Sequence, residues 1–238
     1  MNDTVAAARP AATPSYRASL IPELRTHVER RPDGCLILRS ANPVRDIPQR
    51  CFSEFVPMWA QQRGAVAALC ERDAQGEWRK LTWAQLWQQV QWAAGALRDP
   101  GLGPGRPLMM LSGNSIEQAV LFLAAEHAGI PVAPVSPAYS LRGAPEFTRL
   151  KAVSELCPPA ALFVQSTPDF APALAALAAA GVAVIGVGGA APDMLRYAGL
   201  AATPLTQENL ARLAAAHAAI GDEHVTRVLF TSGSTGAP

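Results

Sequence analysis

The sequence has 238 residues, of which 50% are hydrophobic and 16% are charged, so it can bury a sizeable core and lacks the composition of a disordered chain. Its formal net charge is +1 at pH 7, which gives neither the basic excess typical of nucleic-acid binding nor an acidic excess for a basic partner. The length fits one large domain or two small ones, and the composition indicates no oligomeric state.

The N-terminal part combines a lead-in rich in proline and arginine with the first regular elements. Residues 1–50 show weak periodicity, and we expect them to wrap the main domain with one short helix at Ile21–Glu29. A helix is predicted at Ser53–Gln62. Strands at Ala65–Glu71 and Glu77–Leu81 are expected to form a hairpin around the turn between them.

Two helix starts are recognisable further along the chain. Thr82 is the predicted N-cap of a long helix, because apolar residues recur at helical spacing from Trp83 onward. We expect Trp83 and Trp87 to pack in the core rather than to form a stacking platform. Asn114, with Glu117 three residues later, has the pattern of a second N-cap.

From residue 108 onward, short apolar segments alternate with helical patterns. The apolar segments do not alternate with polar residues, which is typical of a parallel sheet covered on both faces. The sequence therefore predicts an α/β fold with a parallel sheet flanked by helices. The predicted strands are Leu108–Leu111, Pro131–Val135, Ala161–Val164, Val182–Val187 and Thr226–Phe230; the predicted helices are 114–128, Glu146–Leu156, Pro168–Ala180 and Gln207–Ala218.

Membrane, export and metal-binding signals are weak. The uncharged stretch Phe170–Pro192 is broken by glycine and proline, and we interpret it as a helix, a turn and a buried strand rather than a membrane span. Residues 1–14 do not resemble a signal peptide. The scattered cysteines and histidines lack metal-ligand spacing, which favours reduced thiols in a cytoplasmic protein and no metal held by these side chains. They are Cys35, Cys51, Cys70, Cys157, His27, His127, His217 and His224.

The last ten residues, 229–238, run from an apolar strand end into a loop of hydroxyl and glycine residues. Glycine lets a ligand approach the backbone, successive N–H groups can bind an anion, and hydroxyl groups add donors. Phosphate binding is therefore one interpretation, and a Ser/Gly linker is the other. The loop is not a Walker A loop, because no Gly-Lys-Ser/Thr follows at the proper spacing.

The segment Thr231–Pro238, Thr-Ser-Gly-Ser-Thr-Gly-Ala-Pro, resembles the phosphate-loop signature of the adenylate-forming superfamily, which includes acyl-CoA synthetases, luciferases and peptide-synthetase adenylation domains. Lys80–Leu86 partly resembles the strand-to-helix entry of that family. Leu111–Ser115 and Pro134–Leu141 are similar to feruloyl-CoA synthase and its close relatives. The resemblance divides the chain into a lead-in, residues 1–50, and a partial AMP-binding domain, residues 51–238.

The resemblance implies a two-step reaction. A small-molecule carboxylic acid, ferulate or a related aromatic acid, attacks the α-phosphorus of ATP to give an acyl-adenylate and pyrophosphate, and CoA then displaces AMP. The loop would hold the β- and γ-phosphates while Mg²⁺ spreads their charge. By resemblance this role falls to Thr231, Ser232, Gly233, Ser234, Thr235 and Gly236.

In that family a lysine follows the proline of the loop, whereas this sequence ends at Pro238. The family's acyl pocket, ribose-binding aspartate and catalytic lysine would lie beyond this point, so we expect no catalytic residue and no synthetase activity in residues 1–238 alone. An open sheet edge would also favour aggregation of this piece. The alternative hypothesis is a non-catalytic fragment or an interaction protein built on a degenerate synthetase domain.

A second motif points to another class of protein. Gly186–Ala191 fits the Gly-x-Gly-x-x-Ala pattern of a dinucleotide-binding loop. That fingerprint requires an acidic residue at the end of the next strand, whereas Glu208 falls at the start of a predicted helix. We interpret these glycines as a tight turn.

Overall fold

The computed structural model of the chain describes residues 25–42, 48–98, 102–141, 147–177, 182–188 and 194–231. By its internal contacts the chain divides into two compact units, residues 1–47 and residues 48–238.

In the first unit, residues 26–40 form an antiparallel hairpin of β1 (Thr26–Arg30) and β2 (Leu36–Ser40). The turn between them contains Gly34 at φ +84°, a left-handed conformation that glycine adopts without a steric penalty. The helix predicted at Ile21–Glu29 is therefore wrong over its described residues. The turn residues Asp33 and Gly34 bring two strands together there, and cross-strand pairing overrides a weak helical pattern.

The second unit begins with the short helix η1 (Phe52–Glu54) and α1 (Phe55–Arg63), which confirm the predicted helix in this region. A hairpin follows, formed by β3 (Ala67–Arg72) and β4 (Trp78–Thr82). Its turn contains Gly76 at φ +83°. The predicted hairpin is confirmed, with each strand shifted by one or two residues.

The main sheet is parallel throughout and has the strand order β6-β5-β7-β8-β9. The residues of β5 and β7 are all buried, which explains why these strands have no polar alternation in the sequence. The predicted α/β class with a parallel sheet is confirmed. The five strands are β5 (Leu108–Leu111), β6 (Val132–Val135), β7 (Ala161–Val164), β8 (Ala183–Gly186) and β9 (Met194–Arg196).

The fifth predicted strand, Thr226–Phe230, is wrong as a full strand. The segment is extended and makes a single parallel bridge to β6, between Arg227 and Val132. The N–H of Val132 donates to the carbonyl oxygen of Thr226 (3.0 Å), and the N–H of Val228 donates to that of Val132 (2.9 Å). The next donor on this side of β6 would be Pro134, which has no N–H, so the ladder stops after one rung.

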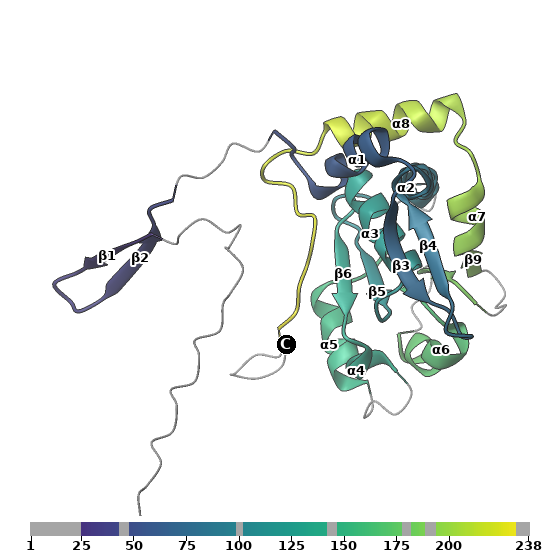
Figure 1. The fold of residues 1–238 in the computed structure, drawn as a ribbon. Coiled ribbons are helices and arrows are strands. Elements are labelled where there is room, and N and C mark those ends of the chain that lie inside the picture. Colours follow the sequence, from purple (N-terminus) through teal and green to yellow (C-terminus); the bar gives the residue numbers. More distant parts are fainter. Residues whose placement is uncertain are drawn as a thin grey trace, which may run out of the picture. The chain divides into compact units, whose positions relative to one another are not determined.

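Helices cover both faces of the sheet (Figure 1). Leu108 and Met110 of β5 join a core cluster that includes residues of the helices α2, α3, α7 and α8. Met109 and Leu111 face the opposite way and pack with residues of α5 and α6. The helices are α2 (Trp83–Arg98), α3 (Ile116–His127), α4 (Pro137–Ser140), α5 (Thr148–Leu156), α6 (Thr167–Ala176), α7 (Tyr197–Ala202) and α8 (Gln207–Ala218).

Four of these helices were predicted from the pattern of apolar residues beyond residue 108, namely α3, α5, α6 and α8, and all are confirmed within the described residues. The short elements α4, α7 and β9 were not predicted, because each is six residues or shorter and shows no periodicity. Trp83 and Trp87 lie partly buried against the core, as expected. Among the described helices, none has the length and apolar character needed to cross a membrane.

The N-cap predicted for α3 is wrong by one residue. Ser115, not Asn114, caps the helix, and its hydroxyl oxygen accepts from the N–H of Gln118 (3.1 Å). Glu117 turns away from the cap and pairs with Arg79. A serine and an asparagine at adjacent positions serve equally well as caps, so local sequence does not decide between them.

The predicted cap of α2 is confirmed. The N–H of Gln85 donates to the hydroxyl oxygen of Thr82 (3.3 Å), and the N–H of Thr82 donates to the Gln85 side-chain oxygen (2.9 Å). We expect Thr82→Ala to lower the free energy of unfolding by about 1 kcal/mol in urea denaturation, because the N–H of Gln85 loses its hydroxyl acceptor at the start of the helix. Gln88→Ala, exposed on the same helix, serves as control. Equal stability of the two variants would contradict the capping role.

Candidate functional site

The sequence places the candidate phosphate loop directly after the segment that lies beside β6. Of the six predicted phosphate-binding residues, only Thr231 belongs to the described part of the chain, where it is exposed. Ser232, Gly233, Ser234, Thr235 and Gly236 lie outside the described residues. The segment runs in the same direction as β6, as its parallel bridge requires, and Figure 1 shows it in yellow. Thr231 therefore follows this segment toward the carboxyl edge of the sheet.

The carboxyl ends of β5, β6 and β7 meet at the same edge, because Leu111 is paired with both Val135 and Val164. In α/β sheets this edge is the usual place for ligand binding. A hollow of about 360 Å³ lies there, which we call the carboxyl-edge hollow. It is lined by Gly113, Pro137, Leu141, Gln165, Ser166, Asp169 and Phe170.

Gln165 holds two of the edge loops together. Its side-chain oxygen accepts from the N–H of Gly113 (3.2 Å) and from the hydroxyl of Ser112 (3.4 Å). This links the loop after β5 to the loop after β7. Sequence reasoning missed Gln165, although a polar residue directly after a wholly apolar strand was a usable signal for a residue at the ligand-binding edge.

The loop after β6 is fixed by its own hydroxyl groups. Ser136 caps the short helix α4 by accepting from the N–H of Ala138 (3.3 Å), and the hydroxyl of Ser140 donates to the carbonyl oxygen of Ser136 (3.3 Å). Of the residues that line the carboxyl-edge hollow, Asp169 carries the charged side chain. The hollow thus offers one carboxylate together with amide and hydroxyl groups, which suits hydrogen bonding and positioning of a polar ligand.

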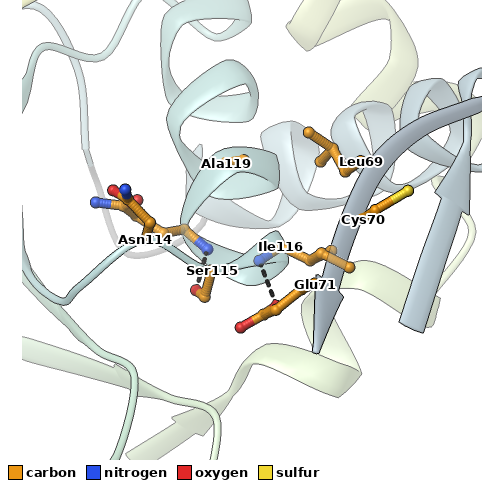
Figure 2. A pocket seen from close by; sticks show the side chains of 8 residues that line it. Leu69, Cys70, Glu71, Asn114, Ser115, Ile116 and Ala119 are labelled. Atoms are coloured by element: carbon orange, nitrogen blue, oxygen red, sulfur yellow. Dashed lines mark hydrogen bonds between the residues drawn. The ribbon is translucent and has the colours of Figure 1, made fainter. Parts of the chain in front are cut away.

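A second hollow, of about 290 Å³, lies between β3 and the start of α3 (Figure 2). A helix N-terminus attracts anions, but here the position is taken by the protein itself. The carboxylate of Glu71 accepts from the N–H of Ile116 (3.0 Å), as Figure 2 shows. We therefore interpret this hollow as part of the structural joint between hairpin and helix, and not as an anion site.

The same joint contains a three-residue ion-pair network. The guanidinium group of Arg79 binds the carboxylate of Glu117 through two nitrogens and that of Glu71 at 2.8 Å. The hydrogen bond with Glu117 is the main reason why the pKa of Arg79 is raised further above its usual value. The Glu117 side chain is only 6% exposed, and its pairing with Arg79 offsets the cost of burying it. The network fixes the β3–β4 hairpin to α3.

The comparison with known families decides what kind of domain this sheet belongs to. The sequence profile of the family described as AMP-binding enzyme matches residues 56–238. The chain belongs to this family. The match runs through the five-stranded sheet, both hollows and the candidate phosphate loop, so the resemblance seen in the loop extends to most of the chain.

A curated relative of this chain is an acyl-CoA ligase. The mitochondrial medium-chain acyl-CoA ligase of Bos taurus is 30% identical over 183 residues, which are 67% of this chain and 28% of that protein. This chain thus spans less than a third of the length of that curated relative.

Solved structures support the fold. Acetoacetyl-CoA synthetase from Streptomyces lividans is 22% identical with a TM-score of 0.61, covering 78% of this chain and 29% of the other. The luciferase-like enzyme of the nonluminescent mealworm Zophobas morio is 17% identical with a TM-score of 0.57, covering 79% and 41%. At these identities the likeness establishes the shared fold.

The segment Gly186–Ala191, which fits the dinucleotide-binding pattern, does not follow the first strand of the sheet, where that pattern is normally found. Gly186 ends β8, which lies between β7 and β9, and it is paired with Val164 and Arg196. Residues 189–191 of the motif lie outside the described residues. The AMP-binding profile covers the whole motif, which favours the family assignment over a dehydrogenase.

Proposed function

We propose that the protein to which this chain belongs is an ATP-dependent acid–thiol ligase. It would join a carboxylic acid to AMP with release of pyrophosphate, and then transfer the acyl group to CoA. The observation that carries the proposal is the AMP-binding family match over residues 56–238, which ends in a hydroxyl- and glycine-rich loop. We assign residues 1–50 to a lead-in and residues 51–238 to part of the AMP-binding domain.

The proposed chemistry explains the need for such a loop. A carboxylate is a poor electrophile, and its conversion to a mixed anhydride with AMP provides a good leaving group. The polyphosphate must be held while charge moves onto pyrophosphate, and backbone N–H groups with hydroxyl donors supply that stabilisation. We propose this role for Thr231, Ser232, Gly233, Ser234, Thr235 and Gly236, with Mg²⁺ on the phosphates.

We further propose which carboxylic acid the ligase uses. The similarity of Leu111–Ser115 and Pro134–Leu141 to feruloyl-CoA synthase favours ferulate or a related aromatic acid. Both segments lie at the carboxyl edge, where the strands β5 and β6 end. We also propose a cytoplasmic location, because CoA and ATP are abundant there.

The test is acid-dependent exchange of labelled pyrophosphate into ATP by the complete protein. Ferulate, benzoate, acetoacetate and octanoate form the panel, and CoA thioester formation is measured after CoA is added. We expect exchange with ferulate and formation of its thioester. Exchange with only an aliphatic acid would overturn the ferulate assignment and keep the ligase, whereas no exchange with any acid would overturn both. Residues 1–238 alone, assayed in parallel, are expected to be inactive.

A further inference from the structure

Three metal-binding side chains meet far from the carboxyl edge. Cys51 and Glu54 lie at η1, and His217 lies at the end of α8, more than 160 positions away. Their ligand atoms, a sulfur, a carboxylate oxygen and an imidazole nitrogen, all lie within 4.8 Å of one another. A hydrogen bond between Glu54 and His217 (3.0 Å) places the end of α8 against η1. The spacing of these residues in the sequence could not reveal this Cys51–Glu54–His217 cluster.

The tautomer of His217 is fixed by a backbone carbonyl. Its Nδ1 lies 3.1 Å from the carbonyl oxygen of His127, which can only accept, so Nδ1 carries a hydrogen. Its Nε2 then faces Oε1 of Glu54 at 3.0 Å. Two lone pairs cannot face each other at that distance, so a positive species, either a proton or a metal ion, lies between them. Histidines that bind metals usually donate their other N–H to a carbonyl or carboxylate in this way.

Glu54 already has a cationic partner. The guanidinium of Arg50 lies 2.8 Å from Oε1. Arg50 offsets the charge of Glu54. Hard cations such as Mg²⁺ and Ca²⁺ prefer several oxygen ligands, so this cluster would bind them weakly.

Cys51 decides which kind of metal fits. Cys51 is buried, and its Sγ lies 3.2 Å from the hydroxyl oxygen of Ser53. A metal binds cysteine as the thiolate, so it must displace the thiol proton. Zn²⁺ does this readily because it favours thiolate and imidazole ligands, unlike Mg²⁺.

We propose that Cys51, Glu54 and His217 bind one Zn²⁺ ion, with the fourth position open to water. In a tetrahedral site the ligand atoms lie about 3.3 Å apart for nitrogen and oxygen and about 3.6 Å apart for sulfur and nitrogen. All three ligand atoms already lie within 4.8 Å of one another, and the 3.0 Å separation between Nε2 of His217 and Oε1 of Glu54 needs to open only slightly. The ion would clip η1 to the end of α8, the helix that leads into the segment before the candidate phosphate loop.

The test uses the complete protein, freed of metal by a chelator and titrated with Co²⁺ and Zn²⁺. We expect one tightly held Zn²⁺ per chain after dialysis and a near-ultraviolet thiolate-to-cobalt absorption band. Cys51→Ser should abolish the band, His217→Gln should weaken Zn²⁺ binding by about tenfold or more, and Cys157→Ser, a matched control, should change neither. Metal-free circular dichroism spectra verify that the variants fold.

The simpler alternative is a protonated His217 paired with Glu54. In that case the wild-type protein gives no thiolate–cobalt band, which overturns the proposal. A band of unchanged strength in Cys51→Ser would overturn it as well, since the thiolate would then come from another cysteine. The cobalt absorption band and the Zn²⁺ content do not depend on ligase activity. A negative result in these measurements would therefore overturn the zinc site without bearing on the proposed function.

Discussion

Replacing Ser232 and Thr235 together by alanine is expected to lower acid-dependent ATP–pyrophosphate exchange in the complete protein by about 100- to 1,000-fold. The two hydroxyl groups would donate to phosphate oxygens whose charge grows as pyrophosphate leaves. Donors placed for a developing charge stabilise the transition state more than the bound substrate, so the rate constant should fall more than the affinity for ATP. Steady-state exchange at several ATP concentrations separates the two effects.

A matched control for the loop variant lies at the end of α7. Thr203 is exposed, and its hydroxyl donates to the carbonyl oxygen of Gly199 (2.8 Å). Thr203→Ala removes a hydroxyl of the same kind away from the carboxyl edge, and should keep the exchange rate within about twofold if the proposed role is local. An unchanged rate in the Ser232→Ala, Thr235→Ala variant, with normal thermal melting, would remove phosphate binding from this loop.

The parallel sheet could be predicted because its strands have a property that sequence displays directly. Leu108–Leu111 and Ala161–Val164 are buried on both faces, and an apolar side chain at every position is the direct consequence. The helix α2 was equally clear, because it has an apolar stripe and the predicted threonine cap at its start. A buried helix or strand that is long enough therefore shows its buried face as a pattern of apolar residues in the sequence.

Elements fixed by tertiary contacts were not predictable in the same way. Met194–Arg196 is a strand because β8 offers a free edge, and three residues carry no periodicity. Thr226–Phe230 has the composition of a strand, yet its pairing depends on Pro134 of a different segment. Whether each of these two segments forms a strand depends on the strand beside it, and the sequence of the segment itself does not reveal that neighbour.

The candidate sites show the same division. The phosphate loop was recognisable because its residues are consecutive and their chemistry is local. Gln165, which joins two edge loops, and the Cys51–Glu54–His217 cluster depend on segments brought together by folding. Long-range clusters of this kind leave no spacing pattern, so only the folded arrangement reveals them.

Replacing Phe163 by alanine is expected to lower the free energy of unfolding by about 3–5 kcal/mol, which is a large fraction of the roughly 5–15 kcal/mol that stabilises a typical domain. Phe163 is fully buried in β7, where Met110 and Ile185 are its paired neighbours on the adjacent strands. Urea denaturation followed by circular dichroism measures the loss. Phe163→Leu keeps most of the volume and should cost under about 1.5 kcal/mol, while Leu156→Ala, at a position 67% exposed, should change stability by no more than about 0.5 kcal/mol. If the alanine variant at position 163 were as stable as the leucine variant, the packed core between the sheet and its helices would be placed wrongly.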